Sequence, residues 1–263
     1  MEDAFQGLDQ QSLFAPITKK TWTVKNSKII PKIMSDAFKL AMKPRRGPVC
    51  INLPRNILAD SNSYNINTKK PSFTNEIKQK GSKDNIKKAA KLIEASNCSV
   101  IIVGAGIKYN SKYKEVIKLA ELCNIPIVTA AGHGDAIPFG HKLNAGQMGP
   151  RGNPVASRLV KNADVILAIG TRLGFNSTFY SYENINKKAK IIQIELEKKM
   201  LGKYFPATVK IHADAATATK QLYDQIKKDK IKLNIKNWTN LYLKERNEYL
   251  QKRDKENLGS NFP

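Results

Sequence analysis

Residues 99–106 read SVIIVGAG, and residues 164–172 read DVILAIGTR. In each stretch a short, continuous apolar run ends at glycine. A run of this length and composition is typical of a β-strand that is buried on both faces of a parallel sheet. The glycine that follows marks the point where the strand ends and the chain turns away. These two stretches therefore predict interior strands of an α/β domain.

Further strands and helices alternate around these two runs, from residue 83 to about residue 230. Ser82 or Asp84 is suited to capping the first helix. Between residues 131 and 150 we expect a long loop that contains glycine and proline. The strands are expected at 125–130, 190–196 and 209–212, and the helices at 84–95, 111–123, 152–162 and 215–229. This alternation predicts an α/β fold with a Rossmann-like parallel sheet covered by helices on both faces.

The segments on either side of this domain differ from it in composition. Residues 1–60 contain a helical pattern at 31–42 and a short apolar strand at 49–53, which predicts a fragment of another α/β domain. Residues 61–82 are rich in Asn, Ser, Thr and Lys, and we interpret them as a linker. Residues 231–263 are charged and predict a surface helix with a frayed end.

The chain is strongly basic. It has 263 residues, and 45 Lys plus Arg against 22 Asp plus Glu give a net charge of +23. A charge of this size is compatible with a nucleic-acid or anionic-membrane partner. However, the lysines are spread along the sequence, and no nucleic-acid-reading motif is present. A solvated lysine surface is the alternative that we favour, and we do not expect nucleic acid as a partner.

The cysteines and the N-terminus indicate a cytoplasmic protein. Cys50, Cys98 and Cys123 are odd in number and lack the spacing of a metal site, which argues against a secreted disulfide scaffold. The first ten residues lack the basic and apolar regions of a signal peptide. No apolar run approaches the roughly 18 residues that a membrane helix requires. We therefore expect no membrane partner and no protein-bound metal in this segment.

Candidate ligand-binding residues follow the expected strands. In open parallel sheets, ligands bind outside the carboxyl ends of the strands. The glycines at 104–106 could admit a phosphate to the backbone, and Arg172 could pair with it. Tyr109 stands where a dinucleotide fingerprint would need its third glycine, and Asn124 stands where it would need an acid. From these residues alone, a nucleotide site and plain tight packing both remain open.

The histidines do not indicate a metal site. His133 and His141 lie in one loop at a spacing that is unusual for zinc, and His212 follows a strand. A structural role in the loop is the reading that we favour for the first two. We expect His212 to be packed or capped.

Several segments resemble a known family. Residues 4–22 (AFQGLDQQSLFAPITKKTW), 30–41 (IPKIMSDAFKLA) and 47–56 (GPVCINLPRN) resemble the end of the first domain of thiamine diphosphate-dependent enzymes of the acetolactate synthase type. Residues 144–175 (NAGQMGPRGNPVASRLVKNADVILAIGTRLGF) and 190–206 (KIIQIELEKKMLGKYFP) look like the central domain of the same enzymes. The segment HGDAIPFGHKLNAG leans toward the sulfoacetaldehyde acetyltransferase branch.

The resemblance implies a domain organisation. Such enzymes have three α/β domains, of which the first supplies a glutamate and the third binds the diphosphate of thiamine through Mg²⁺. Neither element is visible here. The resemblance thus implies the C-terminal part of the pyrimidine-binding domain at 1–60, a linker at 61–82, the central domain at 83–230, and at 231–263 a helical or disordered approach to a missing C-terminal domain. Missing domains or partner chains, in a homo-oligomer (dimer or tetramer), would complete the enzyme.

The resemblance also implies roles for individual residues. Phe5, Gln6 and Lys19 match positions at the active-site entrance, whereas no catalytic residue is expected in this segment. Glu195 stands, with Glu197, where synthases usually have two aspartates, so FAD, ADP or an empty central crevice all remain open. The implied cofactor-binding residues are Gly104, Ala105, Gly106, Gly146, Gly149, Gly170, Thr171, Arg172, Glu195 and Asp214.

Three functions follow as hypotheses. The first is part of an acetolactate synthase-like or sulfoacetaldehyde acetyltransferase-like enzyme that transfers a two-carbon unit from a 2-keto acid or related small-molecule donor, with thiamine diphosphate and Mg²⁺ bound outside this segment. On that hypothesis the isolated chain is inactive. The second is a non-catalytic nucleotide-binding or regulatory module of the same fold. The third is a basic nucleic-acid-binding protein, which has little support in the sequence.

Overall fold

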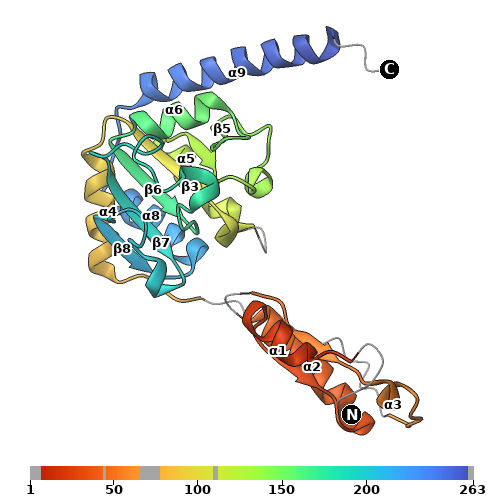
Figure 1. Ribbon diagram of the computed structural model, residues 1–263. Helices are drawn as coiled ribbons and strands as arrows, with labels where there is room; N and C mark the ends of the chain where they lie inside the picture. The colour runs from red at the N-terminus through yellow and green to blue at the C-terminus, as the bar shows by residue number, and fades with distance from the viewer. Residues whose placement is uncertain (1–6, 44–45, 65–77, 109–111, 260–263) are drawn as a thin grey trace. The chain divides into compact units, whose positions relative to one another are not determined.

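The structure is a computed structural model that describes residues 7–43, 46–64, 78–108 and 112–259. The chain divides into two compact units, Met1–Glu76 and Ile77–Pro263 (Figure 1). Phe5 and Gln6 lie outside the described residues.

A six-stranded parallel sheet forms the centre of the second unit. From one edge to the other, the strands follow the order β5-β4-β3-β6-β7-β8. If the six strands are numbered 1 to 6 in chain order, their order across the sheet is 3-2-1-4-5-6. This is the doubly wound order of Rossmann folds. This confirms the predicted fold class. The bounds are β3 Ser99–Val103, β4 Ile127–Thr129, β5 Asn144–Gln147, β6 Val165–Ile169, β7 Lys190–Glu195 and β8 Val209–His212.

Helices cover both faces of this sheet. Helices α4 (Lys83–Glu94), α5 (Tyr113–Cys123) and α8 (Ala215–Lys228) pack on one face together with Ile101 and Val103 of β3. Helix α6 (Pro154–Asn162) packs on the other face with Val100 and Ile102. Because side chains alternate along a strand, a fully apolar strand contributes to both cores. The two cores explain the continuous apolar runs in the sequence.

Polar side chains cap the starts of two of these helices: Ser82, one of the two expected caps, at α4, and Asn153 at α6. The Ser82 hydroxyl accepts a hydrogen bond from the Asn85 N–H at 3.3 Å, and Asn153 accepts one from the Val155 N–H at 2.8 Å. Helix α5 ends at Asn124, which adopts the left-handed conformation with φ of 54°. Asparagine tolerates this conformation better than most residues do. Local sequence therefore fixes these helix ends.

Strand β5 was not predicted, and the expectation of a loop over residues 131–150 is wrong at this point. Its sequence, Asn144–Gln147, is NAGQ, without the β-branched or aromatic residues that favour strands. It pairs with β4 at the edge of the sheet, and the register shifts between Ile127 and Val128. Tertiary pairing thus imposes a strand on a sequence with low intrinsic preference for one.

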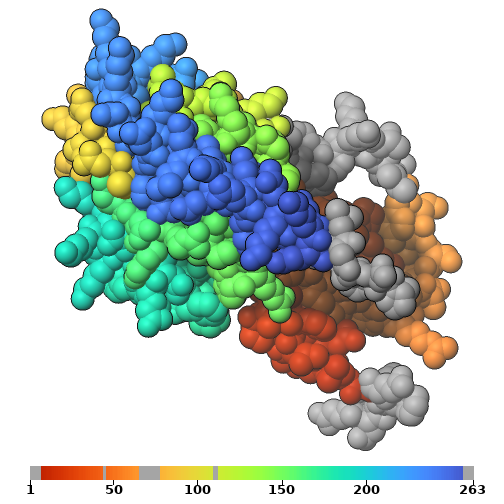
Figure 2. Space-filling view, turned by 90° about the horizontal axis from the view of Figure 1, so that it is seen from above, coloured from red at the N-terminus to blue at the C-terminus, as the bar shows by residue number. Residues whose placement is uncertain are grey.

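Helix α9 (Lys236–Gly259) also differs from the expected surface helix, because its first half packs into the core. The Trp238 indole N–H donates to the Ser99 carbonyl at 3.0 Å, and the Thr239 hydroxyl donates to the Asn124 carbonyl at 2.7 Å. Tyr242 is buried and accepts a hydrogen bond from Asn162 at 2.7 Å. In Figure 2 the helix (blue) runs across α6 (green). Among the described helices, none is long and apolar enough to cross a membrane.

The first unit has a small core. Strands β1 (Thr21–Thr23) and β2 (Cys50–Asn52) form a two-stranded parallel sheet. Helix α2 (Ile30–Met42) confirms the predicted helix, and the shorter helices are α1 (Gln10–Phe14) and α3 (Arg55–Leu58). The buried residues described in this unit are Val24, Ser27, Ala37 and Ile57, whereas exposed apolar side chains include Leu8, Leu13, Ile17, Phe38 and Leu58. Short 3₁₀ turns connect these elements and those of the second unit at Ala15–Ile17, Ser27–Ile29, Ala105–Ile107, Gly134–Ala136 and Lys198–Met200.

Candidate functional site

The carboxyl edge of the six-stranded sheet carries the cofactor-binding residues predicted in the second unit. Because all six strands are parallel, the segments that follow them emerge at one edge. Strand order reverses between β3 and β6, and ligands of such sheets bind at this switch point. Gly104–Gly106 follow β3 and Gly170–Arg172 follow β6, so the structure brings these two segments together.

The glycines of the two segments contact each other directly. An added Cβ on Gly106 would lie 2.6 Å from the Gly170 Cα, and one on Gly104 would lie 2.7 Å from the Gly170 carbonyl oxygen. The Gly104 N–H donates to Ile169, and the Gly106 N–H donates to Gly170. These N–H groups therefore already have protein partners. Of the two readings left open by the sequence, the geometry supports tight packing rather than a phosphate cradle at these glycines.

Gly146, within β5, and Gly149, just after it, have a similar packing role. Gly146 and Gly149 adopt positive φ of 106° and 96°. A Cβ on Gly149 would lie 2.7 Å from the Asn176 carbonyl oxygen, so the segment after β5 packs closely on the segment after β6. The Gly149 N–H donates to the Ser157 hydroxyl at 3.3 Å.

Thr171 and Arg172 have different surroundings. The Thr171 hydroxyl accepts a hydrogen bond from the Leu173 N–H at 3.3 Å. The backbone carbonyl of Thr171 accepts one from the side-chain amide of buried Gln193 at 3.2 Å. The Arg172 side chain is exposed, and within the described part of the chain no hydrogen bond or ion pair occupies it. Arg172 is therefore the predicted residue best placed to receive an anion.

Other charged groups lie near Arg172. Lys108 pairs with Asp135 at 2.8 Å. Burial lowers the pKa of His133, and the positive charges of Lys108 and Arg172 lower it further, against the opposing effect of Asp135. The Nδ1 atom of His133 is buried and has no hydrogen-bond partner among the described residues. These surroundings therefore favour the neutral form of His133.

The Glu195 carboxylate accepts hydrogen bonds from the backbone of the two residues that follow it. One oxygen accepts hydrogen bonds from the N–H groups of Leu196 at 2.9 Å and Glu197 at 3.2 Å. Burial raises the pKa of Glu195, and its two backbone hydrogen bonds and Arg172 only partly oppose this rise. One carboxylate oxygen is therefore already engaged within the strand end.

We expect Glu195→Gln to raise the melting temperature at pH 7. The folded state binds the Glu195 proton more tightly than the unfolded state does, so stability falls as pH rises from the ordinary Glu value of 4.5 through the raised pKa. Glutamine keeps the accepting oxygen without the buried charge. The difference between variant and wild type should vanish below pH 4.5 in thermal unfolding across pH, with exposed Glu183→Gln as control. A higher melting temperature of the wild type at pH 7 would contradict this account.

Asp214 caps helix α8. Its carboxylate accepts hydrogen bonds from the Thr217 N–H and hydroxyl, both at 3.0 Å, and forms an ion pair with Lys112. The side chain is 7% exposed. These contacts are structural, and the predicted cofactor role of Asp214 stays a prediction. His212 is exposed rather than packed, and its ring makes hydrogen bonds with Gln79 at 3.1 Å and the Leu196 carbonyl at 2.9 Å.

In the first unit, Lys19 closes the end of helix α2. Its ammonium donates to the carbonyls of Leu40 at 2.6 Å and Lys43 at 2.8 Å. Desolvation lowers the pKa of Lys19, and the charge of Lys43 adds to this effect. Positive charge is favourable at a helix C-terminus. The ammonium is thus held by the first unit itself, and its role at an active-site entrance stays a prediction.

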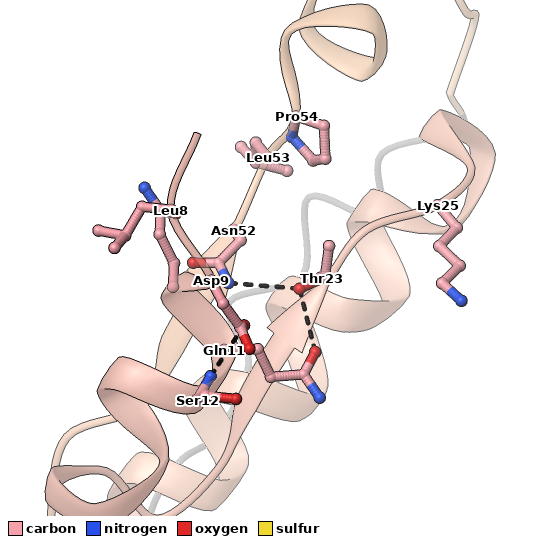
Figure 3. A pocket seen from close by; sticks show the side chains of 10 residues that line it. Leu8, Asp9, Gln11, Ser12, Thr23, Lys25, Asn52, Leu53 and Pro54 are labelled. Atoms are coloured by element: carbon pink, nitrogen blue, oxygen red, sulfur yellow. Dashed lines mark hydrogen bonds between the residues drawn. The ribbon is translucent and has the colours of Figure 1, made fainter. Parts of the chain in front are cut away.

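A pocket that the sequence did not reveal lies beyond the carboxyl ends of β1 and β2 (Figure 3). Its volume is about 550 Å³. The Asn52 amide donates to the Thr23 hydroxyl at 3.3 Å, which donates to Gln11 at 3.1 Å. The position of Thr23 and Asn52 at strand ends is the signal that could have identified it. The lining residues are Leu8, Asp9, Gln10, Gln11, Ser12, Thr23, Lys25, Asn52, Leu53 and Pro54.

Strand order and the switch-point edge together define the second unit as a doubly wound α/β domain of the kind that binds ligands at its carboxyl edge. Residues 86–222 match the family described as thiamine pyrophosphate enzyme, central domain. The chain belongs to this family of thiamine diphosphate-dependent enzymes, as the sequence motifs predicted.

Relatives extend this similarity beyond the central domain. The chain is 34% identical over 223 residues to a probable acetolactate synthase large subunit of Methanocaldococcus jannaschii, covering 84% of this chain and 38% of the relative. It is 32% identical over 241 residues to the acetolactate synthase large subunit of Buchnera aphidicola subsp. Schizaphis graminum, covering 90% and 42%. It is 30% identical over 227 residues to a probable sulfoacetaldehyde acetyltransferase of Rhizobium meliloti, covering 86% and 38%. The chain thus spans about two fifths of these relatives' length.

Proposed function

We propose that this chain forms the central part of a thiamine diphosphate-dependent enzyme that transfers a two-carbon unit from a 2-keto acid or related donor to an acceptor. The supporting observation is the extent of the similarity. A match over 90% of the chain to an acetolactate synthase large subunit includes residues of both units, not the central domain alone. The alternative donor chemistry is that of a sulfoacetaldehyde acetyltransferase, because the chain is also similar to such a protein.

In this proposal the described residues act as scaffold. Among them, no group of three or more His, Cys, Asp or Glu side chains is arranged to hold a metal ion. In this proposal Mg²⁺ and the diphosphate bind outside this segment, as the family resemblance implies. When bound, thiamine diphosphate supplies a nucleophilic carbon and an electron sink. The exposed apolar side chains of the first unit support the proposal that further domains or partner chains cover it in a cytoplasmic oligomer.

The experiment is an assay of the native protein, captured from its source with an antibody against this chain. We expect pyruvate consumption that requires added thiamine diphosphate and Mg²⁺. Sulfoacetaldehyde with phosphate serves as the second donor. Each reaction without thiamine diphosphate serves as its control. If the captured protein consumes neither pyruvate nor sulfoacetaldehyde, the proposed activity is contradicted.

A nucleotide in the central crevice is the second proposal, and Arg172 is the observation that favours it. This exposed guanidinium stands at the switch point, where planar bidentate pairing with a phosphate is possible. FAD and ADP are the two candidates. The engaged groups of Gly104, Gly106 and Asp214 do not add support for either one.

Thermal unfolding with each nucleotide tests this second proposal. Binding at 100 times the dissociation constant stabilises a protein by about 2.7 kcal/mol. We expect ADP or FAD to raise the melting temperature of the chain, and Arg172→Gln to reduce the rise. If neither nucleotide raises the melting temperature, the proposal of a nucleotide in the crevice is contradicted. That result would not test the proposed two-carbon transfer.

Hydrogen exchange should separate the two units of the isolated chain. We expect amides at 7–43 and 46–64 to exchange faster than those of β3 and β6. The first unit buries few apolar side chains, and two parallel strands alone are marginally stable. Exchange followed by mass spectrometry provides the measurement, and β3 serves as the internal standard. Equal protection in both units would show that the first unit folds stably by itself.

A further inference from the structure

Gln193 is a buried polar side chain that bridges two segments at the carboxyl edge of the sheet. It lies on β7 between Ile192 and Ile194 and is 2% exposed. Its amide N–H donates to the Thr171 carbonyl at 3.2 Å, in the segment that follows β6. Its amide oxygen accepts from the Gly202 N–H at 2.7 Å, in the segment that follows β7. One side-chain amide thus joins the two segments.

The two backbone groups depend on this amide. Among the described residues, neither the Thr171 carbonyl nor the Gly202 N–H has another hydrogen-bond partner. Thr171 is itself buried. A buried backbone group without a partner is costly, so an apolar side chain in place of Gln193 would weaken both segments at once.

The segment after β6 needs such support. Leu173 is buried and has a positive φ of 52°, which is unfavourable for leucine and persists only where the surroundings enforce it. The Thr171 hydroxyl accepts from the Leu173 N–H at 3.3 Å, and the Thr178 hydroxyl donates to the Leu173 carbonyl at 3.0 Å. Arg172 lies between Thr171 and Leu173. Its position at the edge is therefore set by contacts in which Gln193 takes part.

The segment after β7 is held at two points. At its start, the Glu195 carboxylate accepts the N–H groups of the next two residues. Further along, Gly202 has a φ of 73°, and a Cβ added there would lie 2.7 Å from the Lys210 Cε atom. Lys210 is the partner of Gln193 in the register of β7 and β8. The contact with Gln193 therefore fixes the middle of this segment.

We propose that Gln193 is a positioning residue that couples the segment after β6 to the segment after β7, so that Arg172 shifts when either segment loosens. A single side chain with two partners gives such a coupling, because losing one hydrogen bond releases the amide from the geometry that the other requires. This inference concerns the chain without a ligand. It therefore stands or falls independently of the proposed nucleotide and of the proposed two-carbon transfer.

The first test is amide hydrogen exchange of the full, ligand-free chain, followed residue by residue by NMR. Gln193→Met removes both hydrogen bonds at similar side-chain volume. We expect it to speed exchange at Leu173 and Gly202 at least about tenfold more than at the amides of β3. Thr219→Val is the matched control, because this buried hydroxyl donates only to the Ala215 carbonyl within α8. It should produce no such difference. An equal change at β3 in Gln193→Met would show that Gln193 contributes only to overall stability, and would overturn the inference.

The second test perturbs one segment and observes the other. Gly202→Ala strains the segment after β7, because alanine is disfavoured at this positive φ. We expect it to speed exchange at Leu173 at least about threefold in the wild-type background and to have no such effect when combined with Gln193→Met. Unchanged exchange at Leu173 in the wild-type background would overturn the coupling. If Gln193→Met is unfolded, Gln193→Asn replaces it in both tests, since the shorter amide cannot reach both partners.

Discussion

Gly106→Val is expected to destabilise the second unit by about 3 kcal/mol, because an added side chain would overlap backbone atoms. The Cβ alone would lie 2.6 Å from the Gly170 Cα, and backbone cannot move aside as a flexible side chain can. Both segments follow central strands of the sheet, so any shift would propagate into β3 and β6. Urea unfolding followed by circular dichroism gives the free energy of unfolding.

Gly140→Val is the matched control. A Cβ at Gly140 meets no atom within 4 Å, and its φ is not positive in the glycine-specific range. The same substitution should therefore change stability by less than about 0.5 kcal/mol. Equal effects of the two substitutions would show that the contact between Gly106 and Gly170 is not close in solution.

Asp214→Ala is expected to cost about 3 kcal/mol in the absence of any ligand. The substitution removes the cap of α8, worth about 1 kcal/mol, and leaves the Lys112 ammonium without its carboxylate in a mostly buried position. Asp214→Asn keeps an accepting oxygen for the Thr217 N–H and should cost less. Thermal unfolding of the ligand-free variants provides the measurement.

Asp135→Ala is the control for charge removal. Asp135 also pairs with a lysine, but its side chain is 69% exposed, so the change should cost less than about 1 kcal/mol. If Asp214→Ala leaves the stability of the ligand-free chain unchanged, the structural account of this residue is wrong. Its carboxylate would then be available for the predicted cofactor role.

Much of the fold followed from local sequence. The apolar run at 99–103 was predicted to the residue, because five consecutive buried residues ended by glycine leave few alternatives. Strand β5 was missed because NAGQ has no strand preference and forms only against β4. The first half of α9 was expected at the surface, since the contacts of Trp238 and Tyr242 with distant segments cannot be read from a charged sequence.

The candidate site was less predictable. Parallel strands dictate that residues after strand ends share an edge, so the positions of Gly104, Gly170 and Arg172 followed from the pattern. Their roles did not follow. Glycine serves both phosphate binding and backbone packing, and only the structure shows that the Gly106 N–H is engaged by Gly170.

The most direct test of the central claim is the thiamine diphosphate-dependent activity of the native protein, together with the mass of every chain in the captured complex. The account predicts that either pyruvate or sulfoacetaldehyde is consumed only when thiamine diphosphate and Mg²⁺ are present. It also predicts a mass above 29.4 kDa for the chain, or partner chains in the complex. A single chain of 29.4 kDa, without partner chains and without cofactor-dependent activity, would contradict the account.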